Sequence, residues 1–166
     1  MKEKNFHRSL FSIFISYFGA HKKLFLIDMS CAFLVSVIDI AFPLVSRFAM
    51  YDLLPGNLYR TFFTVMVIMA MAFGLRAVFY YIITFLGHKF GICVEADIRE
   101  DLYQHFQELD FDFFDKNRTG KLMNRLTGDL FEITELAHHG PEDLLISAAT
   151  IIAVSYTHLT LPTIRL

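Results

Sequence analysis

The chain has 166 residues, of which 55% are hydrophobic and 16% aromatic, and its formal net charge is −2. Soluble domains are typically about 45–50% apolar, so this composition indicates a membrane protein. A slightly negative net charge argues against a nucleic-acid partner. The chain has only two cysteines, each in or beside an apolar run, so we expect neither a disulfide framework nor a metal cluster.

Residues 6–18 predict a short amphipathic helix. Leu10, Phe14 and Phe18 recur every four residues, and Ser12 lies on the opposite face. The segment is too short to cross a bilayer, and its pattern is typical of a helix that lies in the membrane interface. A surface helix packed on protein is the alternative interpretation.

Residues 24–45 form the first predicted spanning segment. The segment is about 22 residues long, against the ~20 that cross the hydrocarbon core. Asp28, Asp39 and Pro43 interrupt it. A helix tolerates such a proline inside a bundle, where neighbouring groups satisfy the freed carbonyl.

Residues 61–108 form the second predicted spanning segment together with a long extension. The part up to Gly87 is apolar, the rest is amphipathic, and no proline interrupts it. A single helix of about 48 residues is ~70 Å long, whereas the hydrocarbon core takes ~30 Å. The remainder must project into water and still bury an apolar stripe. Gly87 and Gly91 have the spacing that permits close helix contact.

Three charged residues lie within the apolar segments: Asp28, Asp39 and Arg76. Charges in such positions usually face a bundle interior, a partner or a cavity. One interpretation is that they line a substrate pathway. The other is an Asp–Arg pair in which the two charges neutralise each other.

A polar turn at residues 111–119 separates two segments of helical periodicity and carries three phenylalanines. Thr119 and Gly120 mark a break at its end. Aromatic groups on a polar turn are costly to leave in water, so we expect them to press against something. They either pack on the ends of their own helices or form a knob that docks into a partner.

Residues 120–154 predict a helix that returns toward the membrane and begins a third span. The apolar part of that span stops after about 11 residues, short of the ~20 needed. Arg125 and Asp129 are four residues apart and should meet on one helix face. His138 and His139 are adjacent and point in different directions on a helix, so their spacing does not predict a metal site.

Residues 155–166 change character and become threonine-rich around Pro162. This tail resembles a translated sequencing adapter. We therefore predict that it is not native and that the natural reading frame continues from within the third span.

The turn and the residues after it carry a family resemblance. Phe113, Phe114 and Asp115, followed by Thr119-Gly120, Arg125 and Asp129, resemble the first intracellular loop of ABC exporters. Lys121 stands where that pattern commonly has an acidic residue. The resemblance covers residues 6–154. It implies an all-α membrane domain with an interfacial elbow helix, two long spanning helices with cytoplasmic extensions, a coupling turn and the start of a third helix.

The resemblance also implies roles for the residues of the turn. The residues that it implies to contact a nucleotide-binding domain are Phe113, Phe114, Asp115, Thr119 and Gly120. Arg125 and Asp129 would hold the loop in shape. The chain would then be the membrane-spanning part of an ATP-driven exporter, working as a homodimer or heterodimer of half-transporters in contact with membrane lipid.

These 166 residues contain no phosphate-binding loop. Gly120-Lys121 is the only Gly-Lys pair, and Asp115 and Leu122 stand where such a loop needs glycine and a hydroxyl residue. The resemblance therefore places ATP and magnesium with domains of the intact protein and predicts no cofactor, catalytic residue or metal in this segment.

The distribution of basic residues predicts how the chain, as a multi-pass protein, is oriented in the cell membrane. They are concentrated before the first span and after the second, while the loop between the spans has only Arg47 and Arg60 nearby. The positive-inside rule places the N-terminus and the turn in the cytoplasm. The alternative function is a two-span sensor or adaptor whose cytoplasmic hairpin binds another protein.

Overall fold

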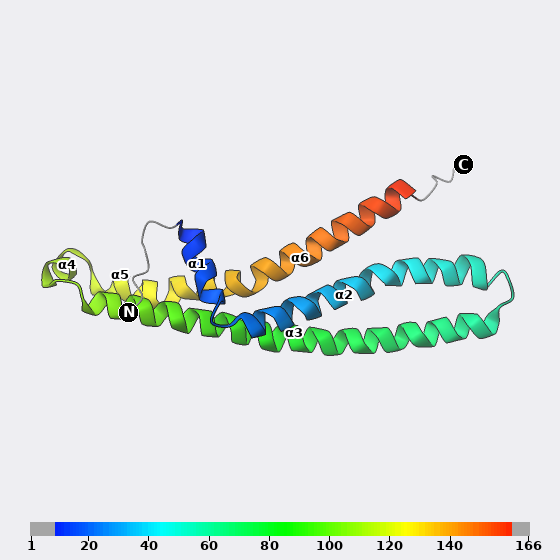
Figure 1. Ribbon diagram of the computed structural model, residues 1–166, viewed down its shortest axis with the longest axis horizontal. Helices are drawn as coiled ribbons and strands as arrows, with labels where there is room; N and C mark the ends of the chain where they lie inside the picture. The colour runs from blue at the N-terminus through cyan, green and yellow to red at the C-terminus, as the bar shows by residue number, and fades with distance from the viewer. Residues whose placement is uncertain (1–8, 161–166) are drawn as a thin grey trace. The chain divides into compact units, whose positions relative to one another are not determined.

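The computed structural model describes residues 9–160, with side chains described through residue 155 (Figure 1). All the regular structure in this range is helical and none of it is strand, which confirms the all-α prediction. The first residues of the predicted elbow, including Phe6, and residues 161–166 of the predicted tail lie outside the described residues. The elements are α1 (Leu10–Phe18), α2 (Lys22–Phe48), π-helical η1 (Ala49–Leu53), α3 (Tyr59–Gln107), α4 (Phe111–Lys116), α5 (Thr119–Asn124), π-helical η2 (Arg125–Asp129) and α6 (Leu130–Thr160).

Two helical segments are long and apolar enough to cross a membrane. They extend over Lys22–Leu53 and Tyr59–Gln107, whereas the sequence predicted residues 24–45 and 61–108. The first continues through Pro43 and ends in η1, so the proline does not end the helix. The turn between the two segments contains Asn57, whose φ of 54° is the left-handed conformation that asparagine tolerates well.

The described chain divides into two compact units, and three helices each contribute to both. The first unit contains residues 9–27 and 86–141. Its core is formed by Phe18, Phe90, Val94 and Ala137. Phe18 from α1 meets Phe90 from α3 edge to face, with ring centroids 4.9 Å apart. This is one of the two favoured geometries for a pair of aromatic rings, and it helps to hold α1 against the extension of α3.

The second unit contains residues 28–85 and 142–160. Its core is formed by Cys31, Ala32, Val35 and Ile83. Within this unit α2 packs along the first half of α3, as the edge-to-face contact of Phe42 with Phe73 shows. Many large apolar side chains of the unit remain exposed, as expected of helices whose outer faces meet lipid or further helices.

The last described element is longer than its sequence predicts. Helix α6 passes through Pro141 and continues beyond Val154 to Thr160. The change of composition at Ser155 therefore does not coincide with the end of the helix. Whether residues 155–166 are native stays a prediction.

Candidate functional site: the α4 turn and the helices that hold it

The predicted turn folds as the short helix α4, whose two ends are held by local hydrogen bonds. The amide of Phe113 donates to the carbonyl of Asp110 at 3.0 Å and so starts α4. At the other end, the Phe113 carbonyl accepts from both the amide and the side-chain Nδ2 of Asn117, at 3.0 and 2.9 Å. Lys116 and Asp112 form an ion pair one turn apart. The segment is therefore a defined helical turn with its own internal bonds.

The three phenylalanines of α4 are not equivalent. Phe113 and Phe114 are half-buried and meet edge to face, with ring centroids 5.5 Å apart and planes at 90°. Phe111 is 90% exposed. Phe113 and Phe114 thus contact each other, while Phe111 presents an uncovered ring. Sequence reasoning did not single out Phe111, because exposure depends on how the turn folds.

The remaining predicted contact residues lie on the surface. Asp115, Thr119 and Gly120 are all exposed, and a Cβ added at Gly120 would meet nothing within 4 Å. Thr119 begins α5 directly after the turn. These three residues are therefore accessible to a partner.

The sequence predicted that Arg125 and Asp129 meet on one helix face, and the structure shows a different pairing. They are the two ends of the π-helix η2. Because a π-helix pairs residues five apart, Asp129 lines up with Asn124, whose Nδ2 donates to Asp129 Oδ1 at 3.2 Å. In the described part of the chain, the ion pair of Arg125 with Asp129 is not formed. The α-helical spacing assumed from the sequence does not hold here.

A polar network that the sequence analysis missed holds η2 and α6 against α3. Arg99 Nε donates to the carbonyl of Leu126 at 3.0 Å, and Arg99 also pairs with Glu95 one turn earlier. The other oxygen of Glu95 accepts from Thr134 Oγ1 at 2.7 Å. In the sequence, Glu95 and Arg99 are only four residues apart on one predicted helix, and nothing there shows which carbonyl lies opposite Arg99.

Helix α1 is fastened to the α3 extension by polar contacts as well as by its aromatic core. Tyr17 OH donates to Asp101 at 2.7 Å, and in the turn that follows the helix His21 Nε2 lies 3.0 Å from Asp97. Leu10, on the same helix, is 87% exposed. One face of α1 therefore packs on protein, and apolar residues near its start remain uncovered, as a helix in a membrane interface requires.

In the second unit, Asp39 and Arg76 form an ion pair, which is one of the two arrangements considered for these charges from the sequence. Arg76 Nε donates to Asp39 Oδ1 at 2.5 Å and Arg76 Nη2 to Asp39 Oδ2 at 3.0 Å. The guanidinium carbon also lies 4.6 Å from the ring centre of Tyr80. Asp28 is buried elsewhere in α2. The two charges of the pair satisfy each other, so Asp39 and Arg76 need no other ion to balance them.

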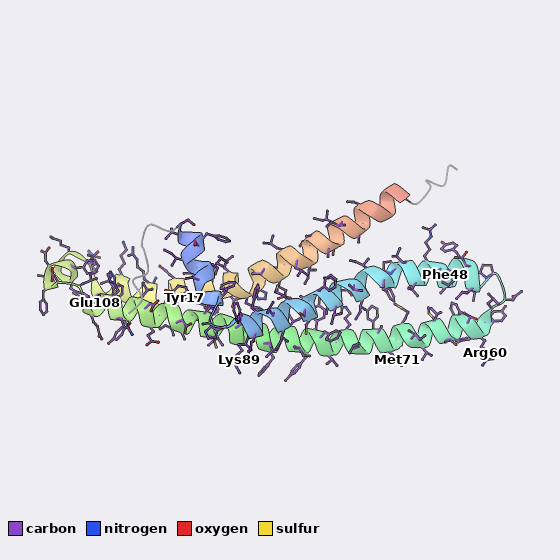
Figure 2. The ribbon with its side chains drawn as sticks, in the orientation of Figure 1. Tyr17, Phe48, Arg60, Met71, Lys89 and Glu108 are labelled. Atoms are coloured by element: carbon purple, nitrogen blue, oxygen red, sulfur yellow. The ribbon has the colours of Figure 1, made fainter. Side chains whose placement is uncertain are left out.

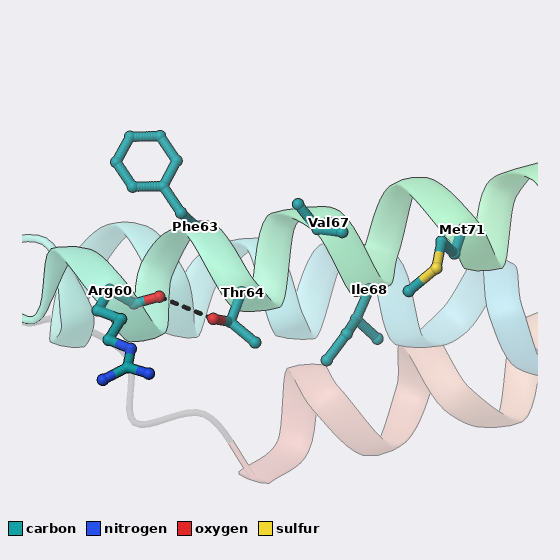
Figure 3. Close-up of a pocket in the computed structure, with 6 residues that line it drawn as sticks. All are labelled: Arg60, Phe63, Thr64, Val67, Ile68 and Met71. Atoms are coloured by element: carbon teal, nitrogen blue, oxygen red, sulfur yellow. Dashed lines mark hydrogen bonds between the residues drawn. The ribbon is translucent and has the colours of Figure 1, made fainter.

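Side chains project along the whole of α3 (Figure 2). Near its start, residues at helical spacing line a shallow, open hollow of about 570 Å³, namely Arg60, Phe63, Thr64, Val67, Ile68 and Met71. Figure 3 shows these residues on one stretch of the helix, with the Thr64 hydroxyl donating to the Arg60 carbonyl at 2.9 Å. The surface is mostly apolar, so it suits lipid or a neighbouring helix.

The fold and site define an α-helical membrane domain: two candidate spanning helices, a continuous extension of the second, and a short helical turn with an exposed ring. The chain belongs to the ABC transporter transmembrane region family, which matches residues 25–161.

Among its relatives are two proteins of Bacillus subtilis (strain 168). The chain is 40% identical over 139 residues to the uncharacterized ABC transporter ATP-binding protein YwjA, covering 84% of this chain and 24% of that protein. It is 25% identical over 154 residues to the putative multidrug export ATP-binding/permease protein YgaD, covering 89% of this chain and 27% of that protein.

A third relative is the ATP-dependent lipid A-core flippase of Syntrophus aciditrophicus (strain SB). The identity is 31% over 75 residues, covering 45% of this chain and 12% of that protein. The chain thus spans about a quarter or less of the length of these relatives.

Proposed function

We propose that this chain is the N-terminal part of the membrane domain of an ATP-driven exporter and that α4 is the element through which a nucleotide-binding domain moves it. The exposed ring of Phe111 carries the proposal, because a 90% exposed phenylalanine on a polar turn is suited to burial in a partner. Burying a phenylalanine contributes about 1.5–3 kcal/mol, enough to fix the turn's position in a groove.

The helices on either side of α4 are built to transmit motion. Helix α3 is continuous over 49 residues, and the Arg99 network ties η2 and α6 to its extension. A displacement applied at the turn therefore moves two connected helices together. Phe113, Phe114, Asp115, Thr119 and Gly120 form the rest of the proposed contact surface, and Arg125 and Asp129 flank it.

The chemistry of ATP belongs to another part of the intact protein. The 166 residues contain no phosphate-binding loop, and the relatives YwjA and YgaD are named as ATP-binding proteins. We infer that the intact protein uses ATP and magnesium at its nucleotide-binding domains. It would pair with an identical or related half-transporter in a lipid bilayer.

We infer further that the protein is a multi-pass cell-membrane protein with α4 in the cytoplasm. The excess of lysine and arginine on the α4 side of the two spans supports this orientation. The relatives include proteins named for multidrug export and for flipping of lipid A-core, which makes large amphipathic molecules the substrate class to test first. A two-span sensor or adaptor is not favoured, since the chain belongs to a transporter family.

Photo-crosslinking tests the proposed contact. In the full-length protein, Phe111 is replaced by the photoreactive amino acid benzoylphenylalanine, and the crosslinked peptides are identified by mass spectrometry. We expect crosslinks from position 111 to the nucleotide-binding domain. Phe131 is the matched control, because it is also an exposed aromatic residue, 56% exposed, but lies on α6 outside the turn. Crosslinks only to lipid or detergent from position 111 would overturn the proposal.

A further inference from the structure

Three histidines from two helices of the first unit converge at one point. His88 lies on α3, and His138 and His139 lie on α6. Each offers a ring nitrogen, and the three nitrogens lie within 4.8 Å of one another. The ring centroids of His88 and His138 are 4.8 Å apart, and those of His138 and His139 are 4.3 Å apart. The sequence showed only the adjacent pair, because His88 is distant in the chain.

A glycine beside the cluster makes this convergence possible. A Cβ added at Gly87 would lie 1.9 Å from Cε1 and 2.2 Å from Nδ1 of His138. One turn further along, a Cβ at Gly91 would lie 2.9 Å from Cγ2 of Thr134. The ring of His138 therefore occupies the space that a side chain at position 87 would fill, which brings it next to His88.

Burial differs among the three rings in a way that suits a ligand site. His138 is only 3% exposed, while His88 and His139 are both exposed. The buried ring is held in place by its surroundings, and the two exposed rings leave a path for an ion from solvent. Glu135 adds a carboxylate, since its Oε2 lies 3.5 Å from Nε2 of His139.

We propose that His88, His138 and His139 bind a divalent transition-metal ion of the zinc type. Imidazole is a preferred ligand of zinc, copper and nickel ions. Tetrahedral ligands at ~2.0–2.1 Å from zinc stand about 3.4 Å apart, so nitrogens that lie within 4.8 Å of one another need to move closer by about 1.4 Å at most. The carboxylate of Glu135 either orients His139, with a water molecule as the fourth ligand, or is itself the fourth ligand.

Such an ion would join α3 to α6 close to Pro141. Because its ligands come from both helices, bound metal would favour the conformation in which the helices are in contact over any in which they separate. The site would thus act as a brace on the helix pair. This proposal concerns the described helices alone and does not depend on the exporter assignment.

Metal binding is tested on the chain itself, purified without a histidine tag, in detergent and after chelator treatment. Zinc is titrated by calorimetry, and cobalt(II) is titrated by absorption to report tetrahedral coordination. We expect one ion per chain. His88→Ala and His139→Ala should each weaken zinc binding at least about tenfold, since loss of a ligand costs at least as much as loss of the groups that orient one.

Two further variants make the result specific. His105→Ala is the matched control, because His105 is exposed and lies further along the same helix, and it should bind zinc like the unaltered chain. Replacing the buried His138 can disturb packing, so the two exposed histidines carry the test. Absence of saturable zinc binding, or equal binding by the variant lacking both His88 and His139, would overturn the proposal.

Discussion

Arg76 on α3 holds Asp39 on α2 with two parallel hydrogen bonds, at 2.5 and 3.0 Å. The fork of the guanidinium matches the two carboxylate oxygens, which is the strongest geometry for such a pair. Both residues lie in candidate spanning helices, where a lone charge is costly. The pair therefore explains how two of the three charged residues in the apolar segments are accommodated.

Removing one partner should destabilise the helix pair. In Asp39→Asn, Arg76 keeps its charge in an apolar segment without a counter-ion, and we expect the free energy of unfolding to fall by about 2–3 kcal/mol. Unfolding in mixed micelles by a denaturing detergent, followed by circular dichroism, measures the change. The double variant Asp39→Asn/Arg76→Gln should recover most of the loss, because it leaves no charge unpaired.

Arg47→Gln serves as the control for this experiment, since Arg47 is an exposed basic residue near the end of α2. It should change the free energy of unfolding by no more than about 0.5 kcal/mol. A single Asp39→Asn variant as stable as the unaltered chain would show that the pair contributes nothing to the packing of α2 on α3.

Two glycines of α3 should respond in opposite ways to the same substitution. Gly87→Ala places a Cβ on the ring of His138, so we expect a loss of about 1–3 kcal/mol from overpacking. Gly74→Ala meets nothing within 4 Å and should gain up to about 1 kcal/mol from helix propensity. The same detergent titration compares the two variants. Equal effects would mean that α6 does not approach α3 at Gly87.

The sequence predicted most of the fold and only part of the site, and particular residues show why. Apolar length and uninterrupted periodicity sufficed for α2 and α3, because a helix that crosses a membrane satisfies its own backbone. The exposure of Phe111, the Asn124–Asp129 bond in a π-helix and the meeting of His88 with His138 all depend on local winding or on helix contact. Periodicity along one helix does not contain that information.

The hydrogen bond from Arg99 should protect the backbone amides in and next to η2 from exchange with solvent. Arg99→Lys keeps the charge beside Glu95 but removes the Nε–H that donates to the carbonyl of Leu126. A hydrogen bond to a charged group contributes about 1.5–3 kcal/mol, so amide exchange in residues 125–130 should become roughly tenfold faster or more. Hydrogen exchange with mass spectrometry measures this. Exchange in α2 is the internal control, because the hydrogen bonds of Arg99 described above go to Glu95 and Leu126. Uniform acceleration would instead indicate global destabilisation.

Substitutions in α4 should separate docking from local packing. Phe111→Ala removes only an exposed ring, so the stability of the membrane domain should stay unchanged while transport by the full-length protein falls relative to ATP hydrolysis. Phe114→Ala should also uncouple transport from hydrolysis without preventing membrane insertion, because it removes the ring that packs on Phe113. Vesicle transport and phosphate release, measured on the same preparations, give the ratio. Unchanged transport in both variants would contradict docking through α4.

The last prediction concerns the reading frame of the gene across the junction between Val154 and Ser155. Helix α6 and the family match both continue past it, to Thr160 and residue 161, whereas the composition changes abruptly at Ser155. We expect sequencing of the source DNA across this point to show an apolar frame that completes the third span and later encodes a Gly-x-x-x-x-Gly-Lys-[Ser/Thr] loop. A confirmed stop after Leu166 would mean that the chain has no nucleotide site of its own. Any nucleotide-binding domain that acts on α4 would then have to come from a separate chain.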